Sequence, residues 1–372
     1  MSALPANRAH YIVRQHQLSS RSLVSHMKLL ILGGTRFVGR HLVSAALARN
    51  HEVTLFNRGK HSPTSFETTV ETIHGDRNSD LNKLSGRHWD AIIDTCGLLP
   101  RAVEASAAAL ADSVDLYVFI SSVSAYADMS QPGVDESGAL ATLTSEQLEE
   151  ANAIDASGQG SAASYGKMYG GLKALCEQEV REVFPNSHLI VRPGLIVGPY
   201  DYTDRFTYWV ERVGAGGEVL APGRRERMLQ FIDARDLSQW IIQMLEHEPS
   251  GVYNANGKPG CVTMERLLQE CKATSKSDAL FTWVDEDFLL REQIMAWSEL
   301  PLYLPEEAAP HLKGFMFVNS EKAIADGLAF RPLKETIADT LSWRRTVANE
   351  PLQAGLTTDR EQMLLRKWHE MH

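Results

Sequence analysis

The sequence has few cysteines and none of the common zinc-binding motifs. Its 372 residues include four cysteines, none of them in a CxxC pair, and there is no HExxH stretch. These absences argue against a zinc site and against a disulfide framework, and they favour a reducing cytoplasm as the compartment. We therefore expect no metal in the functional site.

Basic residues and long hydrophobic runs are also scarce. The 37 Lys and Arg residues are outnumbered by 47 Asp and Glu residues, for a formal net charge of −10. Nucleic acid is not expected as a partner, because binding a phosphate backbone needs clustered cations. No apolar run approaches the roughly 20 residues that cross a bilayer, so no membrane association is expected. A globular protein acting on a small-molecule substrate is the simplest expectation.

The first 26 residues contain no acidic side chain and end just before Met27, where an apolar run begins. We predict that this leader lies outside the fold. It lacks the apolar region of a secretory signal. An organelle transit peptide, an added extension and an upstream start codon all remain open.

From Met27 onward, short runs typical of β-strands alternate with helical patterns, which predicts an α/β fold with a doubly wound, Rossmann-type parallel sheet. We expect this domain over 27–195, with 230–250 returning to it. A smaller, discontinuous substrate lobe is expected over 196–229 and 251–372. The predicted strands are Lys28–Leu32, Glu52–Phe56, Thr69–His74, Ala91–Asp94, Asp115–Ser121 and His188–Val191.

The stretch "ILGGTRFVGRHL" lies between the first strand and an amphipathic helix, which is the context of a dinucleotide-binding turn. Gly33 permits the tight turn, and Gly39 allows the helix to pack closely on the strand. Arg36 stands where the usual pattern has a glycine, and its guanidinium is suited to an adenosine phosphate. A simple βα turn is the alternative. The predicted cofactor-binding residues here are Gly33, Gly34, Thr35, Arg36, Phe37, Val38 and Gly39.

The second strand ends in Asn57 and Arg58, where an NAD-preferring fold usually has a carboxylate for the ribose 2′-hydroxyl. An arginine instead favours a 2′-phosphate. We therefore predict that NADP is favoured over NAD. The alternative is that Arg58 is an exposed turn residue.

Tyr169 and Lys173 lie four residues apart, so on a helix they share one face. A nearby ammonium favours the phenolate, which makes the pair a usable acid and base. Ser122, at the end of an apolar strand, would hydrogen-bond the reacting oxygen. The alternative is a surface tyrosine with a solvated lysine. Tyr165 is the competing tyrosine, but it has no lysine four residues on.

Over about 27–345 these motifs resemble the extended short-chain dehydrogenase/reductases, also called the NAD-dependent epimerase/dehydratase family. The resemblance rests on "GGTRFVG", "HGDR", "DTCG", "SSVSAY", the Tyr169/Lys173 pair, "VRPGLIVGP" and "QFIDARDL". It implies a nicotinamide cofactor, a homodimer, and roles for Tyr169, Lys173 and Ser122 in hydride and proton transfer. The further cofactor-binding residues implied are Asp76, Arg77, Thr95, Cys96, Gly97, Ser121, Arg192, Pro193 and Gly194.

The sequence departs from this family where many nucleotide-sugar enzymes have an arginine that grips the diphosphate; here the residue is Leu229. Arginines just upstream are candidates to replace it, or they form a solvated turn. The segment "YDYTDRFTYW" either meets substrate or packs the second lobe. The candidate substrate residues are Asp204, Arg205, Tyr208, Trp209, Arg224 and Arg227.

The favoured function is an NAD(P)-dependent epimerase, dehydratase or reductase acting on a carbinol or carbonyl, such as that of a nucleotide sugar. An idle NAD(P)-binding scaffold or sensor is the alternative, and the retained Ser122, Tyr169 and Lys173 argue against it. A third hypothesis is an RNA-binding role, because "GGTRF" and "NRG" resemble family members that bind stem-loop RNA in plastids. The acidic composition argues against that role.

Overall fold

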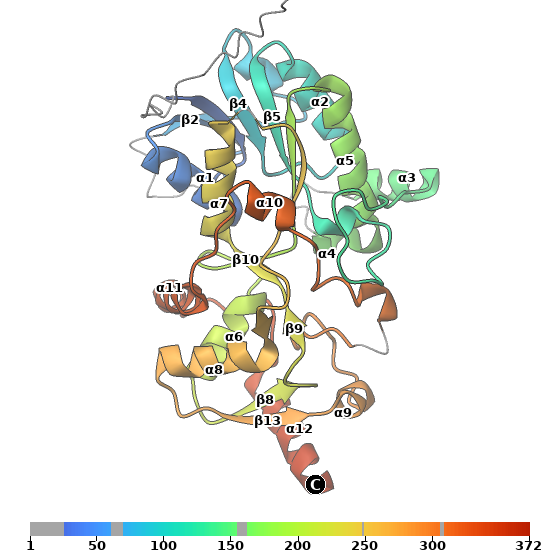
Figure 1. The fold of residues 1–372 in the computed structure, drawn as a ribbon, viewed down its shortest axis with the longest axis vertical. Helices are drawn as coiled ribbons and strands as arrows, with labels where there is room; N and C mark the ends of the chain where they lie inside the picture. The colour runs from blue at the N-terminus through green and yellow to red at the C-terminus, as the bar shows by residue number, and fades with distance from the viewer. Residues whose placement is uncertain (1–25, 61–69, 155–161, 248, 306–308) are drawn as a thin grey trace, which may run out of the picture.

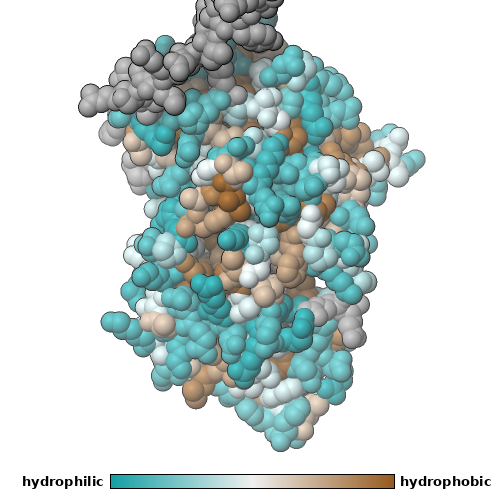
Figure 2. Space-filling model, viewed as in Figure 1, coloured by the Kyte–Doolittle hydropathy of each residue, from teal (hydrophilic) through white to brown (hydrophobic). Residues whose placement is uncertain are grey.

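The computed structural model describes residues 26–60, 70–154, 162–247, 249–305 and 309–372. The predicted leader, apart from its last residue, lies outside the described residues. The molecule is elongated, with a sheet-containing half at one end and a largely helical half at the other, which carries the C-terminus (Figure 1). Figure 2 shows one face as mainly hydrophilic, with hydrophobic residues gathered near its middle.

The first half is built on one parallel sheet in the order β11-β6-β5-β4-β1-β2-β3, which confirms the predicted doubly wound, Rossmann-type fold. The order reverses between β1 and β4, and ligands in such sheets bind at the carboxyl ends beside this switch. The strands are β1 Lys28–Leu32, β2 Glu52–Asn57, β3 Glu71–His74, β4 Trp89–Asp94, β5 Val114–Ile120, β6 His188–Pro193 and β11 Gly251–Ala255.

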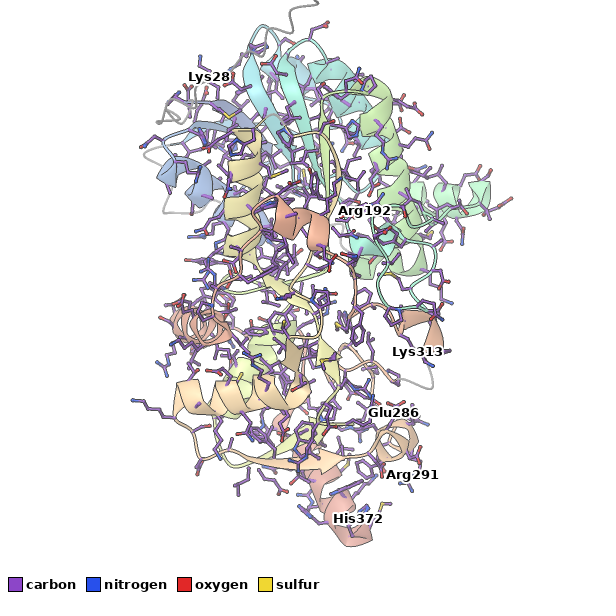
Figure 3. The ribbon with its side chains drawn as sticks, viewed as in Figure 1. Lys28, Arg192, Glu286, Arg291, Lys313 and His372 are labelled. Carbon is purple, nitrogen blue, oxygen red and sulfur yellow. The ribbon has the colours of Figure 1, made fainter. Side chains whose placement is uncertain are left out.

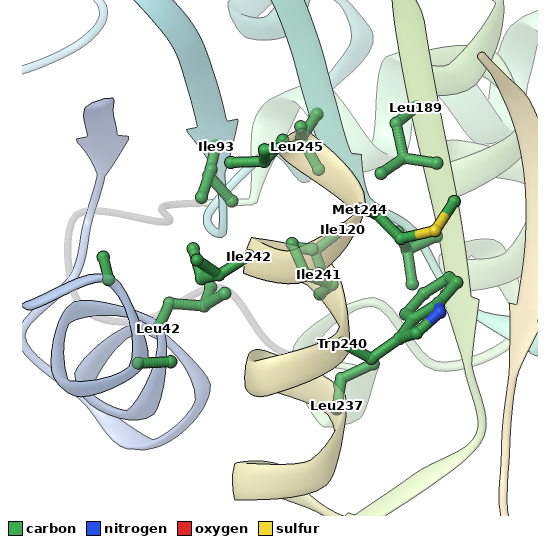
Figure 4. Packing of buried hydrophobic residues seen from close by; sticks show 14 of the residues in the cluster. Leu42, Ile93, Ile120, Leu189, Leu237, Trp240, Ile241, Ile242, Met244 and Leu245 are labelled. Atoms are coloured by element: carbon green, nitrogen blue, oxygen red, sulfur yellow. The ribbon is translucent and has the colours of Figure 1, made fainter. Parts of the chain in front are cut away.

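Helices cover both faces of this sheet because alternate strand residues point to opposite sides. Leu29 and Ile31 share a core with α1 and α7, whereas Leu30 and Leu32 share a core with α2 and α5. Figure 4 shows Leu42 of α1 facing Ile242 of α7 beside the sheet. The covering helices are α1 Phe37–Ala48, α2 Pro100–Leu110, α5 Tyr169–Val183 and α7 Ala234–Leu245.

One strand differs from the sequence-based division into lobes. Residues 251–255, expected in the substrate lobe, form β11 and pair with β6 at the edge of the central sheet. Its short run "GVYNA" has no clear alternation of apolar and polar residues, which is typical of a strand buried on both faces and hard to recognise from periodicity. α10 Glu321–Ala325 packs beside it.

The second half has its own core, made largely by α6, α8, β8, β13 and the C-terminal helices. β7 pairs with β10 where the chain passes between the two halves. The elements of this half and the junction are β7 Leu195–Val197, α6 Arg205–Gly214, β8 Glu218–Pro222, β9 Met228–Leu229, β10 Phe231–Asp233, β12 Val262–Thr263, α8 Met264–Ser275, β13 Leu280–Val284, α9 Glu286–Arg291, α11 Leu333–Thr346 and α12 Thr358–Met371.

A small polar excursion lies between β5 and α5. It carries α3 Ser145–Ala153, which begins with a capping box between Thr144 and Gln147, and α4 Ala162–Tyr165. None of the helices in the described ranges has the length and apolar character needed to cross a membrane.

Candidate functional site

The glycine turn after β1 has the backbone that a phosphate-binding loop requires. Gly33 and Gly34 have φ angles of +98° and +84°, a region that side chains disfavour. A Cβ on Gly39 would lie 2.7 Å from the Cα of Gly34, so only glycine lets α1 approach the glycine turn this closely. Arg36 occupies the N-cap of α1 without a side-chain capping bond. The turn and the first N–H groups of α1 therefore suit a pyrophosphate.

Side chains around this turn divide into two groups. Phe37 is buried, and Val38 packs against the core between the sheet and α1. Thr35 and Arg36 are half-buried. The guanidinium carbon of Arg36 lies 3.9 Å from the centroid of the Tyr202 ring, which comes from the loop after β7. This cation–π contact joins the cofactor turn to the second half of the molecule.

At the end of β2, the side chain of Asn57 forms hydrogen bonds with two turns. Its Oδ1 accepts a hydrogen bond from the N–H of Gly59 at 2.8 Å, and its Nδ2 donates to the carbonyl of Gly33 at 3.4 Å. Arg58 is exposed at the same corner. The expected cation is thus beside the glycine turn, with an amide in place of a carboxylate.

Two arginines expected to bind cofactor are held by buried carboxylates instead. Arg77 donates to both oxygens of Asp94, at 3.0 and 2.8 Å. Burial by itself would raise the pKa of Asp94, but the charge and hydrogen bonds of Arg77, together with hydrogen bonds from Cys96 and Tyr117, outweigh burial and lower the pKa. Arg192, labelled near the middle of the molecule in Figure 3, donates to both oxygens of Glu177 at 2.8 and 2.6 Å. Both guanidiniums therefore form ion pairs with buried carboxylates of the fold.

Other predicted cofactor residues also have definite structural partners. Ser121 donates to Glu177 at 2.6 Å, and Thr95 donates to the carbonyl of Leu32 at 2.7 Å. The carboxylate of Asp76 accepts from the N–H of Asn78 at 2.9 Å. Gly194 donates its N–H to the side chain of Asn256. Cys96 and Gly97 follow β4, and Pro193 ends β6, so all three lie at carboxyl ends of the sheet.

The predicted catalytic residues come from two neighbouring elements. Tyr169 begins α5, and Lys173 follows one turn later on the same helix. Lys173 is 4% exposed, and its ammonium donates to the carbonyls of Gly97 and Ile120 at 2.7 and 2.8 Å. Ser122 accepts from the N–H of Ser124 at 3.1 Å. The lysine is therefore fixed at the carboxyl ends of β4 and β5.

Gly170 explains how the start of α5 comes so near the Ser122 segment. A Cβ on Gly170 would lie 2.1 Å from the carbonyl oxygen of Ser124. Any other residue would push the helix away, so this glycine places Tyr169 beside the turn that carries Ser122. Tyr165, the competing tyrosine, is buried in an apolar cluster with Leu172 and Met168, and the half-buried Tyr169 packs against the same cluster.

Packing within the fold accounts for the positions of most of the predicted substrate residues. Trp209 is fully buried and donates its indole N–H to the carbonyl of Pro301 at 2.7 Å, and Tyr208 lies in the same core. Asp204 accepts from the backbone N–H of Gln353 at 2.9 Å. These placements favour the packing alternative for the three residues. Arg205 differs, because it stacks over the Trp297 ring at 5.5 Å.

Two of the upstream arginines form ion pairs within the second half of the molecule. Arg227 pairs with Glu286 at 2.9 Å, and Arg225 pairs with Glu265 at 3.0 Å. Arg224 is exposed, and Leu229 is buried in the second core.

Two residues of the loop after β7 were missed by the sequence analysis. Asp201 is fully buried; its Oδ1 accepts from the backbone and hydroxyl of Thr203, and its Oδ2 has no partner among the described residues. Burial raises the pKa of Asp201 to about 6. Burial also raises the pKa of Tyr202, where the charges of Arg36, Asp201 and Tyr169 all act. The spacing D-x-T was a sequence signal for the Asp201 turn.

Within the described residues, no group of three or more His, Cys, Asp or Glu side chains is arranged to hold a metal ion.

The comparisons with known proteins agree with this fold. Residues 29–255 match the family model of the NAD dependent epimerase/dehydratase family, and the chain belongs to that family. This confirms the resemblance on which the sequence analysis relied.

Solved structures with the same fold are distant in sequence. The UDP-N-acetylglucosamine 4-epimerase from Bacillus cereus is 14% identical, with a TM-score of 0.62 over 88% of this chain and 99% of that one. The UDP-glucuronic acid 4-epimerase from Bacillus cereus, in complex with NAD, is 16% identical, with a TM-score of 0.60 over 86% and 99%. They support the fold.

A curated relative is the chloroplast stem-loop binding protein of 41 kDa b from Arabidopsis thaliana. It is 27% identical over 270 residues, which are 67% of this chain. The chain spans 64% of the length of that relative.

Proposed function

We propose that this protein is an NAD(P)-dependent enzyme of the epimerase, dehydratase or reductase type, with Tyr169 as acid and base, Lys173 as its partner and Ser122 as the donor to the reacting oxygen. The observation that carries the proposal is the fixed position of Lys173. Two of its three N–H donors are satisfied by carbonyls at the carboxyl ends of β4 and β5. The third is suited to a ribose hydroxyl or to Tyr169.

A dinucleotide fits the residues that are present. The two glycines with positive φ and the uncapped start of α1 suit its pyrophosphate. When bound, a nicotinamide accepts or returns a hydride at the reacting carbon. The chain itself moves the proton: Tyr169 accepts it from the substrate hydroxyl during oxidation and returns it during reduction. Ser122 orients the same oxygen.

Tyr169→Phe tests this assignment. The variant should bind dinucleotide as the wild type does and lose turnover by at least about 100-fold, the usual scale for an acid/base group. Tyr165→Phe is the matched control, because it removes a buried hydroxyl four residues away without changing the apolar packing. Stopped-flow hydride transfer and dinucleotide fluorescence separate chemistry from binding. Near wild-type turnover in Tyr169→Phe would eliminate the assignment.

We propose NADP as the favoured cofactor, on the ground that Arg58 and Asn57 stand where a carboxylate would select NAD. The cytoplasmic compartment and the homodimer stay predictions.

RNA binding is a second candidate, favoured by the name of the plastid stem-loop binding relative. The net charge of −10 opposes it. A gel-shift assay with structured RNA at physiological salt decides the matter. Salt-sensitive binding would support the RNA role, and its absence would dispose of it.

A further inference from the structure

The loop after β7 packs on the start of α1 through two pairs of arginine and tyrosine. The guanidinium carbon of Arg36 lies 3.9 Å from the centroid of the Tyr202 ring, and that of Arg40 lies 4.0 Å from the centroid of the Tyr200 ring. The N–H of Arg40 donates to the carbonyl of Arg36, so the two arginines share one face of the helix. Both distances lie well within the roughly 6 Å over which a cation is attracted to an aromatic face.

The backbone of this loop is strained on both sides of Tyr202. Tyr200 has a φ angle of +70°, which is uncommon for a bulky aromatic residue, and Asp204 has a φ angle of +56°. Such conformations persist only where neighbouring contacts hold them, and they are frequent at ligand-binding sites. His41 of α1 supplies a further contact, because its Nε2 lies 3.0 Å from the carbonyl oxygen of Pro199. The loop is therefore held against α1 by a series of contacts, although Tyr202 itself is 43% exposed.

The two pairs differ in their position relative to the glycine turn. Arg36 is the N-cap residue of α1, so its side chain starts between the glycine turn and the first N–H groups of the helix, where a pyrophosphate fits. Arg40 begins one helical turn farther along. Contact with an aromatic face does not need the N–H donors of a guanidinium, which are the atoms that bind a phosphate. Tyr202 can therefore hold Arg36 while Arg36 binds a phosphate.

A long arginine side chain loses rotamer freedom when it binds a phosphate, and this loss lowers the affinity unless the side chain is already held in place. We propose that Tyr202 is a positioning residue for the dinucleotide: its ring holds the guanidinium of Arg36 at the glycine turn, where the guanidinium binds a phosphate of the cofactor. That phosphate is either the pyrophosphate or the 2′-phosphate of NADP. The inference rests on the proposed function for the presence of a dinucleotide, and its test separates the two.

The test is calorimetric titration of the full chain with NADP⁺ and with NAD⁺. Arg36→Gln should weaken dinucleotide binding about tenfold or more, the scale of a hydrogen bond to a charged group. Tyr202→Leu should weaken it about three- to tenfold, because the guanidinium loses the contact that holds it. Tyr202→Phe keeps the ring face and should bind within about twofold of the wild type. A larger loss for NADP⁺ than for NAD⁺ assigns Arg36 to the 2′-phosphate, and equal losses assign it to the pyrophosphate.

A double-mutant cycle separates positioning from a general structural role. In the Arg36→Gln background, Tyr202→Leu should change dinucleotide affinity by less than about twofold, because the ring then has no guanidinium to hold. Tyr200→Leu is the matched control: it removes the parallel contact with Arg40 from the same loop and should leave the affinity within about twofold. Thermal unfolding checks that each variant is folded, and Tyr202→Met replaces Tyr202→Leu if the leucine variant is not.

Three results would overturn the inference. They are additive losses for Arg36→Gln and Tyr202→Leu, a loss in Tyr202→Phe equal to that in Tyr202→Leu, and a loss in Tyr200→Leu as large as that in Tyr202→Leu. A wild-type chain that binds dinucleotide while Tyr202→Leu has no effect overturns this inference alone. Absence of dinucleotide binding in the wild type overturns the proposed function as well.

Discussion

Two buried carboxylates of the dinucleotide-binding half, Glu177 and Asp94, have hydrogen-bond donors on both oxygens, whereas Asp201 in the loop after β7 has donors on one oxygen only among the described residues. Glu177 accepts hydrogen bonds from Arg192, Arg181 and Ser121, and Asp94 accepts from Arg77 and Tyr117. Asp201 and Arg205 have buried atoms without such partners in the described part of the chain. The comparison teaches that an arginine at a strand end can be paired with a buried carboxylate of the fold, whereas a buried carboxylate oxygen without a donor keeps an uncompensated desolvation cost.

Breaking the buried ion pair between Arg192 and Glu177 should have the largest effect on stability. Arg192→Gln leaves Glu177 buried with much of its charge uncompensated, so the free energy of unfolding should fall by about 3–5 kcal/mol. Urea unfolding measures it. The control is Arg87→Gln, which breaks an exposed pair with Glu71 and should cost less than about 1 kcal/mol. Equal losses in the two variants would remove the distinction between the buried and exposed pairs.

The carboxyl of Asp201, whose Oδ2 has no partner among the described residues, should instead make the stability of the fold depend on pH. The pKa of Asp201, raised to about 6 by burial, lies above its ordinary value near 3.8. The protonated carboxyl is therefore preferred in the fold, and its stabilising contribution is lost as pH rises from about 4 through 6. Asp204 and Arg205 face the same group. Relative to Asp201→Asn, the wild type should lose up to roughly 3 kcal/mol across this window.

Chemical unfolding of both proteins at pH values from 4 to 7 measures this difference. A gap that is constant with pH would show that Asp201 does not titrate in this range.

The smallest expected effect concerns an exposed charge. Arg58→Asp should shift the ratio of NADP to NAD affinity toward NAD by about tenfold, since a 2′-phosphate would lose a cation and a ribose hydroxyl would gain an acceptor. Stability should hardly change, because Arg58 is exposed. Parallel titrations with both dinucleotides provide the measurement, with Arg291→Gln as the control for charge. An unchanged ratio would contradict the NADP prediction.

Much of the dinucleotide half was predictable because its signals are local. The strands, the glycine turn and the four-residue spacing of Tyr169 and Lys173 are all readable within short windows. The partners of Arg77 and Arg192 were not readable, because each carboxylate lies 15 or more residues away and only folding brings it near. The same holds for Gly170, whose neighbour Ser124 comes from another element.

By itself, the sequence determined the fold class, the phosphate-binding turn and the amino acids available for proton transfer, since these depend on local periodicity and backbone freedom. Only the tertiary structure decided which of the buried charges are paired with one another. The physical reason is that desolvation and pairing depend on neighbours in space: Asp94 and Asp201 are both fully buried carboxylates, but Arg77 pairs with Asp94 and the Oδ2 of Asp201 has no partner among the described residues.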